Sequence, residues 1–155
     1  MGFNTKSNLQ FVHVVLMTPE GRLVVIRELY CRTMQKWSAT VSRPMVMKNF
    51  DNEGGTAVKA ATTGVFTKFA FRPTEDDLSQ VTCHYASTLE KIMHLYICKI
   101  PSGRRLECSM HTRIRILTLE RICNELLSDP QDFTPETEKA INLISGLKTA
   151  SGAAV

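Results

Sequence analysis

The spacing of apolar and polar positions divides the chain into strand-like and helix-like segments. Six segments are rich in apolar and β-branched residues or alternate apolar with polar ones, and they predict strands at residues 11–17, 23–27, 37–41, 80–87, 91–100 and 110–117. Pro19 and Gly21 lie between the first two segments and favour a turn, so we expect an opening β-hairpin. The fourth and fifth segments are expected to form a meander through residues 88–90.

Three further segments carry apolar residues at helical spacing, and they predict helices at residues 56–71, 119–127 and 135–147. Thr118 is a favourable N-cap for the second helix, and Thr134-Pro135 is a start signal for the third. Gly64 lies inside the first helix and weakens it by about 1 kcal/mol relative to alanine. A glycine there indicates either close packing or simple tolerance.

The order of these elements predicts an α+β fold in which a mixed β-sheet is layered between helices. The length of 155 residues suits a single domain, and we expect residues 1–8 and 148–155 to be flexible.

The composition is that of a globular chain with a mildly basic balance. Hydrophobic residues make up 43% and charged residues 22% of the sequence. The net charge of +4 permits an anionic partner, but lysines and arginines are spread along the chain, so we do not expect nucleic acid. No apolar segment approaches the ~20 residues that span a bilayer, and no membrane partner is expected.

The cysteines favour a reducing compartment. Their number is odd, no C-x-x-C pair occurs, and their spacings are irregular: they are Cys31, Cys83, Cys98, Cys108 and Cys123. His13 interrupts the short apolar run near the N-terminus, so no secretory signal is visible. On these grounds we expect a cytoplasmic protein.

Four segments together carry a resemblance to a known family. They are residues 11–28 (FVHVVLMTPEGRLVVIRE), 36–42 (KWSATVS), 54–71 (GGTAVKAATTGVFTKFAF) and 119–144 (LERICNELLSDPQDFTPETEKAINLI). In this order they resemble the opening hairpin, the strand that leads into the signature motif, the helix of that motif and the closing helices of the Nudix hydrolase superfamily. The resemblance implies a Nudix-like fold and, for the family, magnesium-dependent hydrolysis.

The signature motif, the Nudix box, has lost its ionisable residues in this chain. In the family it reads G, five residues, E, seven residues and then R-E-U-x-E-E-x-G-U, where U is apolar. The opening glycine and first glutamate fall on Asn49 and Gly55. The later motif positions fall on Thr63, Gly64, Val65, Thr67, Lys68, Ala70 and Phe71. Only the apolar positions are kept.

The missing acids remove the cofactor that the family implies. Magnesium is bound through carboxylate oxygens, and in phosphate chemistry it neutralises charge and activates water. Residues 56–71 contain no Asp or Glu and carry Lys59 and Lys68, which would repel a cation. A slip of one or two residues in the register brings no carboxylate into the helix. We therefore predict no catalytic residue, no metal ligand and no cofactor.

One branch of the family, the isopentenyl-diphosphate isomerases, has a similar strand before the box. That branch has a Trp-Thr-Asn-Thr-type strand running into a Cys and a His-Pro. Residues 37–44 (WSATVSRP) are similar but one residue shorter, with Val41 or Ser42 near the Cys position and Arg43 near the His position. Because the reactive Cys and the His ligand are both missing, isomerase activity is not expected.

Five residues are candidates for binding a nucleotide-like or phosphorylated ligand: Arg27, Tyr30, Trp37, Arg43 and Lys68. The aromatic rings could stack on a base, and the basic groups could bind phosphates, with an ammonium in place of the metal. The alternative for each is structural: Trp37 packs in the core, the arginines lie on the surface, and Lys68 is solvated.

Two other sets of residues could carry chemistry. The acids near the box lie in predicted loops, and the pair Asp76-Asp77 is the first to test among Asp51, Glu53, Glu75, Asp76 and Asp77. A zinc site is a weaker alternative, because no strong metal pattern matches the spacing of Cys83, His84, Cys98, Cys108 and His111.

We therefore expect a Nudix-fold protein without the catalytic box. It would be a non-hydrolytic binding or interaction module for a nucleotide-like or phosphorylated ligand or for a protein partner. A second copy of the chain could be that partner, giving a homodimer. The missing glutamates argue against an enzyme. Two alternatives stay open: an atypical diphosphate hydrolase that uses acids outside the box, such as Glu53 or Asp77, and a structural subunit of a larger assembly.

Overall fold

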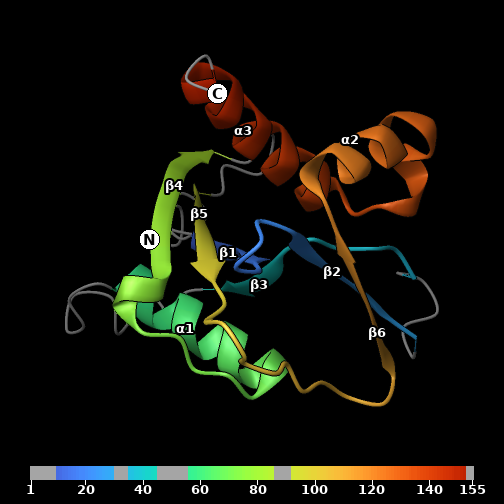
Figure 1. Cartoon of the computed structure of the whole chain (residues 1–155). Coiled ribbons are helices and arrows are strands. Elements are labelled where there is room, and N and C mark those ends of the chain that lie inside the picture. The colour runs from blue at the N-terminus through green and yellow to red at the C-terminus, as the bar shows by residue number, and fades with distance from the viewer. Residues whose placement is uncertain (1–9, 30–34, 45–55, 86–91, 153–155) are drawn as a thin grey trace, which may run out of the picture.

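The computed structural model of the protein describes residues 10–29, 35–44, 56–85 and 92–152, and Figure 1 shows their arrangement. The strands in these residues are β1 (Gln10–Met17), β2 (Leu23–Glu28), β3 (Val41–Pro44), β4 (Leu78–Tyr85), β5 (Ile92–Lys99) and β6 (Thr112–Leu117). The helices are α1 (Thr56–Phe69), α2 (Leu119–Ser128) and α3 (Pro135–Gly152), with short 3-10 turns η3 (Glu75–Asp77) and η5 (Pro130–Asp132).

The strands form one mixed sheet that splits at its centre. The order is β4-β5-β1-β2-β6, and β1 pairs parallel with β5 but antiparallel with β2. Pairing between β1 and β2 is recorded only at Met17 and Leu23, beside the hairpin turn. Farther along, β1 pairs with β3 instead, while β2 pairs with β6 and bridges to Ser38. The two halves of the sheet therefore diverge, and the gap between them is where the candidate functional site described below lies.

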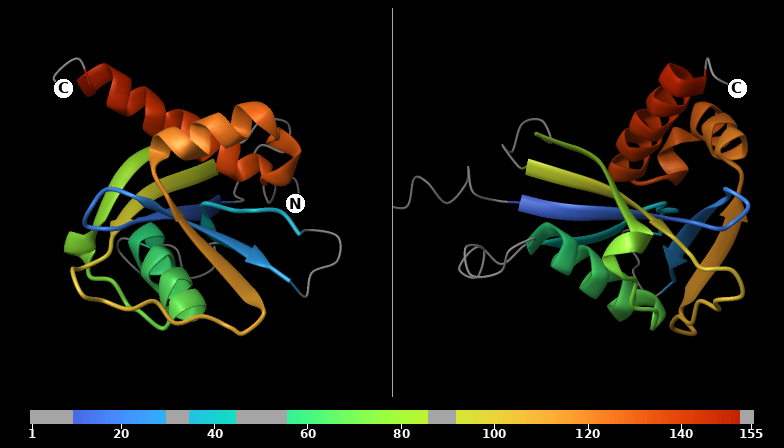
Figure 2. Two further views of the ribbon diagram at one scale, coloured as in Figure 1. Left: turned by 45° about the vertical axis from the view of Figure 1, so that its right-hand side comes forward. Right: turned by 60° about the vertical axis from the view of Figure 1, so that its left-hand side comes forward.

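Helices cover the sheet on both faces, as Figure 2 shows. The alternation along β1 explains this, because Val12, Val14 and Leu16 join the buried cluster under α1, whereas Val15 joins the cluster under α2 and α3. This layered arrangement confirms the predicted α+β fold. None of the helices in the described part of the chain combines the length and apolar character that a bilayer crossing requires.

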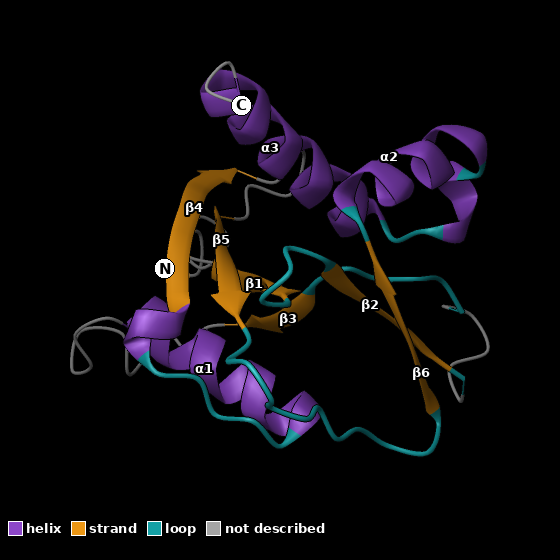
Figure 3. Ribbon diagram, in the orientation of Figure 1, coloured by secondary structure: helices purple, strands orange, loops and turns teal. Residues whose placement is uncertain are grey.

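Helix α1 ends in an unusual conformation. Ala70 follows the helix with a φ of +56°, and its N–H donates to the Phe66 carbonyl at 2.8 Å. The left-handed region costs an L-residue roughly 1–2 kcal/mol, so glycine is usual at this position. The next contact comes from residues 100–111, which run past this end of α1 (Figure 3), and Glu107 N–H donates to the Phe69 carbonyl at 3.1 Å.

Most predicted elements are confirmed, but the third strand was placed too early. The pattern predicted residues 37–41, whereas β3 is Val41–Pro44 and Trp37 makes only an isolated bridge, to Phe133. Proline lacks an N–H and so is tolerated on a strand that has a partner on one side only. In the described residues β3 pairs only with β1, which is why Pro44 can belong to it.

Three smaller differences concern the ends and faces of elements. Helix α3 continues to Gly152, past the predicted helix end at residue 147, and no proline in this segment opposes the extension. Strand β4 begins at Leu78, directly after η3. The apolar residues Ile116 and Leu127 are 48% and 83% exposed, although the apolar spacing of the strand and of the helix placed them on the side expected to be buried.

Candidate functional site

An open cavity of about 230 Å³ lies where the two halves of the sheet part, and we call it the central cavity. Its lining comes from β2, residues 36–40, β3, the end of α1 and the start of α3: Ile26, Glu28, Lys36, Ser38, Thr40, Val41, Ser42, Lys68 and Thr134. Hydroxyl and charged groups outnumber apolar side chains in this set. The surface exposed inside the cavity is nevertheless mostly apolar, so the cavity suits a ligand with both polar and apolar parts.

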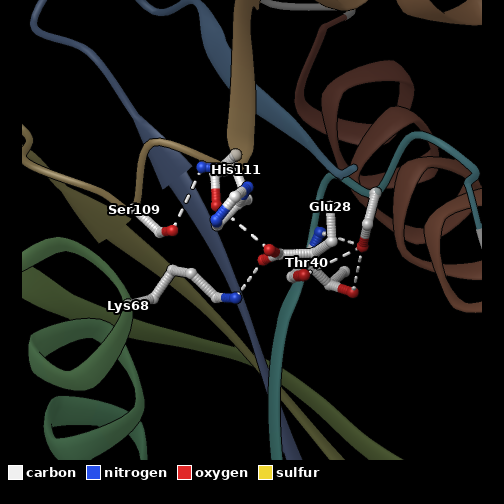
Figure 4. A network of polar contacts seen from close by, with 7 residues as sticks. Glu28, Thr40, Lys68, Ser109 and His111 are labelled. Carbon is white, nitrogen blue, oxygen red and sulfur yellow. Dashed lines mark hydrogen bonds and ion pairs between the residues drawn. The ribbon is translucent and has the colours of Figure 1, made fainter. Parts of the chain in front are cut away.

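An ion pair between α1 and β2 forms one wall of the central cavity. Lys68 Nζ donates to Glu28 Oε1, and Figure 4 shows the two side chains pointing toward each other. The second carboxylate oxygen, Glu28 Oε2, accepts from Thr112 Oγ1 at 3.0 Å. Lys68 and Glu28 side chains are 30% and 21% exposed, so water screens the pair only in part. Both oxygens of the carboxylate thus have a protein donor.

The secondary structure explains why these groups meet. Successive residues of a strand point to opposite faces, so Glu28 shares the α1 face of β2 with Ile26, while Arg27 points to the other face. Thr112 is the direct cross-strand neighbour of Glu28. Lys68 lies in the last turn of α1, where a cation also stabilises the carbonyl end of the helix.

Hydroxyl groups hold the opposite wall. Ser38 Oγ donates to the Thr40 carbonyl at 2.9 Å, and the Thr40 N–H donates to Ser38 Oγ at 3.2 Å. The Ala39 N–H donates to Thr137 Oγ1 at 2.9 Å, which ties this segment to the first turn of α3. The hydroxyls of Thr134 and Thr137 form a hydrogen bond, with their oxygens 2.7 Å apart. The wall is therefore fixed by side chains far apart in sequence.

Solved structures show the same architecture. A protein described as an ADP compounds hydrolase has a TM-score of 0.66 and 15% identity, covering 94% of this chain and 75% of its own. The NUDIX hydrolase from Nitrosomonas europaea has a TM-score of 0.61 at 10% identity, covering 90% and 89%. The NUDIX domain of Shewanella oneidensis NrtR, solved with ADP ribose, has 0.57 at 10%, covering 88% and 86%.

The chain has the Nudix fold. These identities are too low to show more than the fold. No protein-family profile and no curated protein matches the sequence.

By the resemblance drawn from the sequence, α1 carries the positions of the Nudix box. The apolar box positions Val65 and Phe71 are buried, as predicted. A Cβ atom added to Gly64 would lie 3.6 Å from Arg43 Cβ and 3.7 Å from Val41 Cγ1, which are ordinary contact distances. Gly64 is therefore tolerated there rather than required for close packing. Thr67 is exposed and borders a separate depression beside Glu107.

The structure places four of the five predicted ligand-binding residues, and it divides these four between two faces of the sheet. Lys68 lines the central cavity, and Arg43 packs nearby over Gly64 without lining the cavity. Arg27 and Trp37 lie on the opposite face, with the Arg27 guanidinium carbon 4.8 Å from the centre of the Trp37 ring. Tyr30 falls outside the described residues. The single groove that the sequence suggested is thus not assembled, and the binding roles of these residues stay predictions.

Of the residues that line the cavity, sequence reasoning named only Lys68 as a ligand-binding candidate, and the missed residues include Glu28, Lys36 and Thr134. Glu28 carried a usable signal, because it ends an apolar strand on the same face as Ile26. Its partner Lys68 lies on a distant helix, however, and no local pattern links them. Lys68 is accordingly not the solvated lysine of the structural alternative, because it is paired with Glu28 and its side chain is only 30% exposed.

The acids proposed to rescue hydrolysis do not reach the central cavity where the structure describes them. Asp77 Oδ2 accepts from the Thr74 N–H at 2.9 Å and from Thr74 Oγ1 at 3.1 Å, so it caps η3. Asp76 is exposed and does not line the cavity. Asp51 and Glu53 lie outside the described residues.

The zinc alternative finds no support in the described residues, where no three His, Cys, Asp or Glu side chains gather. Cys98 is buried under α1, and burial raises the pKa of its thiol to about 12. A thiol with so high a pKa is a poor ligand and a poor nucleophile at neutral pH. The side chains of Cys83 and His84 lie outside those described.

Proposed function

We propose that the central cavity binds a nucleotide-like or otherwise phosphorylated small molecule without hydrolysing it. The observation that carries the proposal is the Lys68–Glu28 ion pair, which stands at the end of the box helix where the Nudix box has two glutamates. The solved NrtR domain with ADP ribose supports the ligand class, because it has the same fold.

The lining supports binding of a phosphate or a sugar. Lys36 lines the cavity, and none of the ion pairs among the described residues involves it, so we propose that its ammonium binds an anionic group of the ligand. The hydroxyls of Ser42 and Thr134 each have a protein partner, His13 Nδ1 at 2.6 Å and Thr137 Oγ1 at 2.7 Å. A hydroxyl oxygen has a second lone pair that can accept from a sugar hydroxyl. At about 230 Å³ the cavity is smaller than the roughly 300–1,000 Å³ of most ligand pockets. It is therefore suited to one end of a nucleotide-sized ligand.

The same lining argues against magnesium. Magnesium prefers carboxylate oxygens in octahedral geometry. Glu28 is the one acid among the lining residues that the structure describes, and Lys68 and Thr112 already occupy its two oxygens. The Lys68 ammonium beside it would also repel a divalent cation. The residues present do not fit the metal, so we assign no metal-dependent step to them.

The binding half of the proposal is tested by calorimetry with ADP-ribose, ADP and ribose 5-phosphate. We expect saturable binding of at least one of these that Lys36→Gln weakens about tenfold, the loss of one charge-assisted hydrogen bond. Lys99→Gln is the matched control, because Lys99 is exposed at the end of β5 and outside the cavity. Equal loss in both variants, or no binding by any of the three compounds, would contradict the proposal.

A further inference from the structure

The sheet face opposite the central cavity carries three arginines side by side. In the antiparallel pair of β2 and β6, Arg27 stands opposite Arg113, and Val25 stands opposite Arg115. Opposed residues point to the same face, as do residues two apart on one strand. We call Arg27, Arg113 and Arg115 the arginine face. In Figure 1 the two strands lie below α2.

Trp37 orders two of these arginines. The guanidinium carbons of Arg27 and Arg115 lie 4.8 Å and 5.3 Å from the centre of its ring. Such stacking fixes the plane of a guanidinium and leaves the N–H groups at its edge free to bind an anion. The ring is already in contact with two cations, so we do not assign base stacking to Trp37.

The positive charge on the arginine face is only partly balanced. Glu125 of α2 accepts from Arg115 Nη1 at 3.0 Å and Nη2 at 2.8 Å, and it accepts from Arg121 Nε at 2.8 Å as well. Arg113 donates to the Met110 carbonyl at 3.0 Å. Arg27 forms no ion pair within the described residues, and its Nε is buried without a hydrogen-bond partner. Like charges directly opposed across two strands are unfavourable unless an anion compensates them.

We propose that the arginine face binds the phosphate or diphosphate group of a small molecule, between Arg27 and Arg113. The pair of Glu125 and Arg115 shows how a carboxylate binds on this face: its two oxygens accept from the two terminal N–H groups of one guanidinium, which form a planar fork. Arg27 and Arg113 offer two guanidinium groups from neighbouring strands, and their two positive charges match a dianion better than a single carboxylate. A phosphate dianion presents oxygens in several directions and can accept from both. This site is separate from the central cavity, and it does not depend on the function proposed there.

The test uses inorganic pyrophosphate as the probe and records binding by calorimetry in the Lys36→Gln background, which reduces any contribution from the central cavity. Arg113→Gln is expected to weaken binding about tenfold, because it removes one charge-assisted hydrogen bond. Arg113 is exposed, so the substitution should leave the core of the protein intact. Arg113→Lys keeps the charge but loses the fork, and we expect a smaller loss. Arg27→Lys tests the second fork in the same way. Arg105→Gln is the matched control, an exposed arginine in the segment before β6.

Three results would overturn the proposal. An equal loss in Arg105→Gln would mean that only the net charge attracts pyrophosphate. Tighter binding of a glutamate-rich peptide, or of a single-stranded oligonucleotide, that Arg113→Gln abolishes would assign the face to a macromolecule. Absence of pyrophosphate binding at low salt would show that the arginine face binds no diphosphate. This outcome is independent of the central cavity, where Arg113→Gln should leave the binding of ADP-ribose unchanged.

Discussion

Ala70 ends helix α1 in the left-handed conformation that glycine favours. By the resemblance described above, this position corresponds to a glycine of the Nudix box. The last hydrogen bonds of α1 and the contact from residues 100–111 hold the backbone of Ala70 in this conformation.

Ala70→Gly should therefore stabilise the protein. Relief of the left-handed strain outweighs the greater chain entropy of unfolded glycine, and we expect a gain of about 0.5–1 kcal/mol in the free energy of unfolding. Urea denaturation measures it. Ala60→Gly inside the same helix is the control and should cost about 1 kcal/mol. Destabilisation by both substitutions would show that Ala70 is not strained.

The Lys68–Glu28 pair is the residue-scale basis of the proposed function. Removal of one partner by Lys68→Met or Glu28→Gln leaves the other half-buried and uncompensated, and each should cost about 1 kcal/mol. The double variant should lose less than the sum of the two, by about 0.5–1 kcal/mol of coupling. Urea denaturation of all four proteins completes the cycle. Additive losses would mean that the pair is not formed in solution.

At the scale of elements, the sequence was most informative where a pattern is local. The hairpin, the box helix and the capped start of α2 follow from spacing and caps, and Thr118 Oγ1 does accept from the Arg121 N–H at 3.1 Å. The placement of β3 failed because Trp37 is held by a bridge to Phe133, a contact nearly a hundred residues away that no local pattern carries.

The candidate site could be predicted only in part for the same reason. Lys68 was identified from its place in the box helix, but its partner Glu28 comes from β2 through tertiary packing. Strand alternation alone predicts that the adjacent residues Arg27 and Glu28 face opposite ways, but it does not tell which of them faces Lys68. That parity was available in the sequence, whereas the identity of the facing groups was not.

The contact between β6 and α2 should depend on pH. The Arg115 guanidinium, with a smaller contribution from Arg121, holds the pKa of Glu125 below its ordinary value of 4.5. A lowered folded-state pKa gives stability that is complete above the unfolded pKa and is lost as the pH falls through the folded pKa. The urea midpoint should therefore drop below about pH 4.5 in the wild type and less in Glu125→Gln.

Glu20→Gln is the control for this pH series, because Glu20 is exposed in the turn between β1 and β2. It should follow the wild type at every pH. Identical acid profiles for Glu125→Gln and the wild type would show that the ion pair does not contribute.

At the scale of the whole molecule, the Nudix fold presents two different polar surfaces on the two sides of one sheet. The central cavity lies on the α1 side, with an ion pair at the end of the box helix. The arginine face lies on the side of α2, with Trp37 and Glu125 as its neighbours. Because the central cavity and the arginine face lie on opposite sides of the sheet, a substitution can remove binding at one site and leave the other site unchanged.

The central claim is that the box helix now takes part in binding and no longer in hydrolysis. Its most direct test is the release of phosphate or nucleoside monophosphate from ADP-ribose, NADH, dinucleotides and nucleoside triphosphates, with and without Mg²⁺, beside an active Nudix hydrolase. We predict no release above the protein-free rate at any Mg²⁺ concentration, although a ligand binds. Turnover that requires Mg²⁺ and survives repurification would contradict the account.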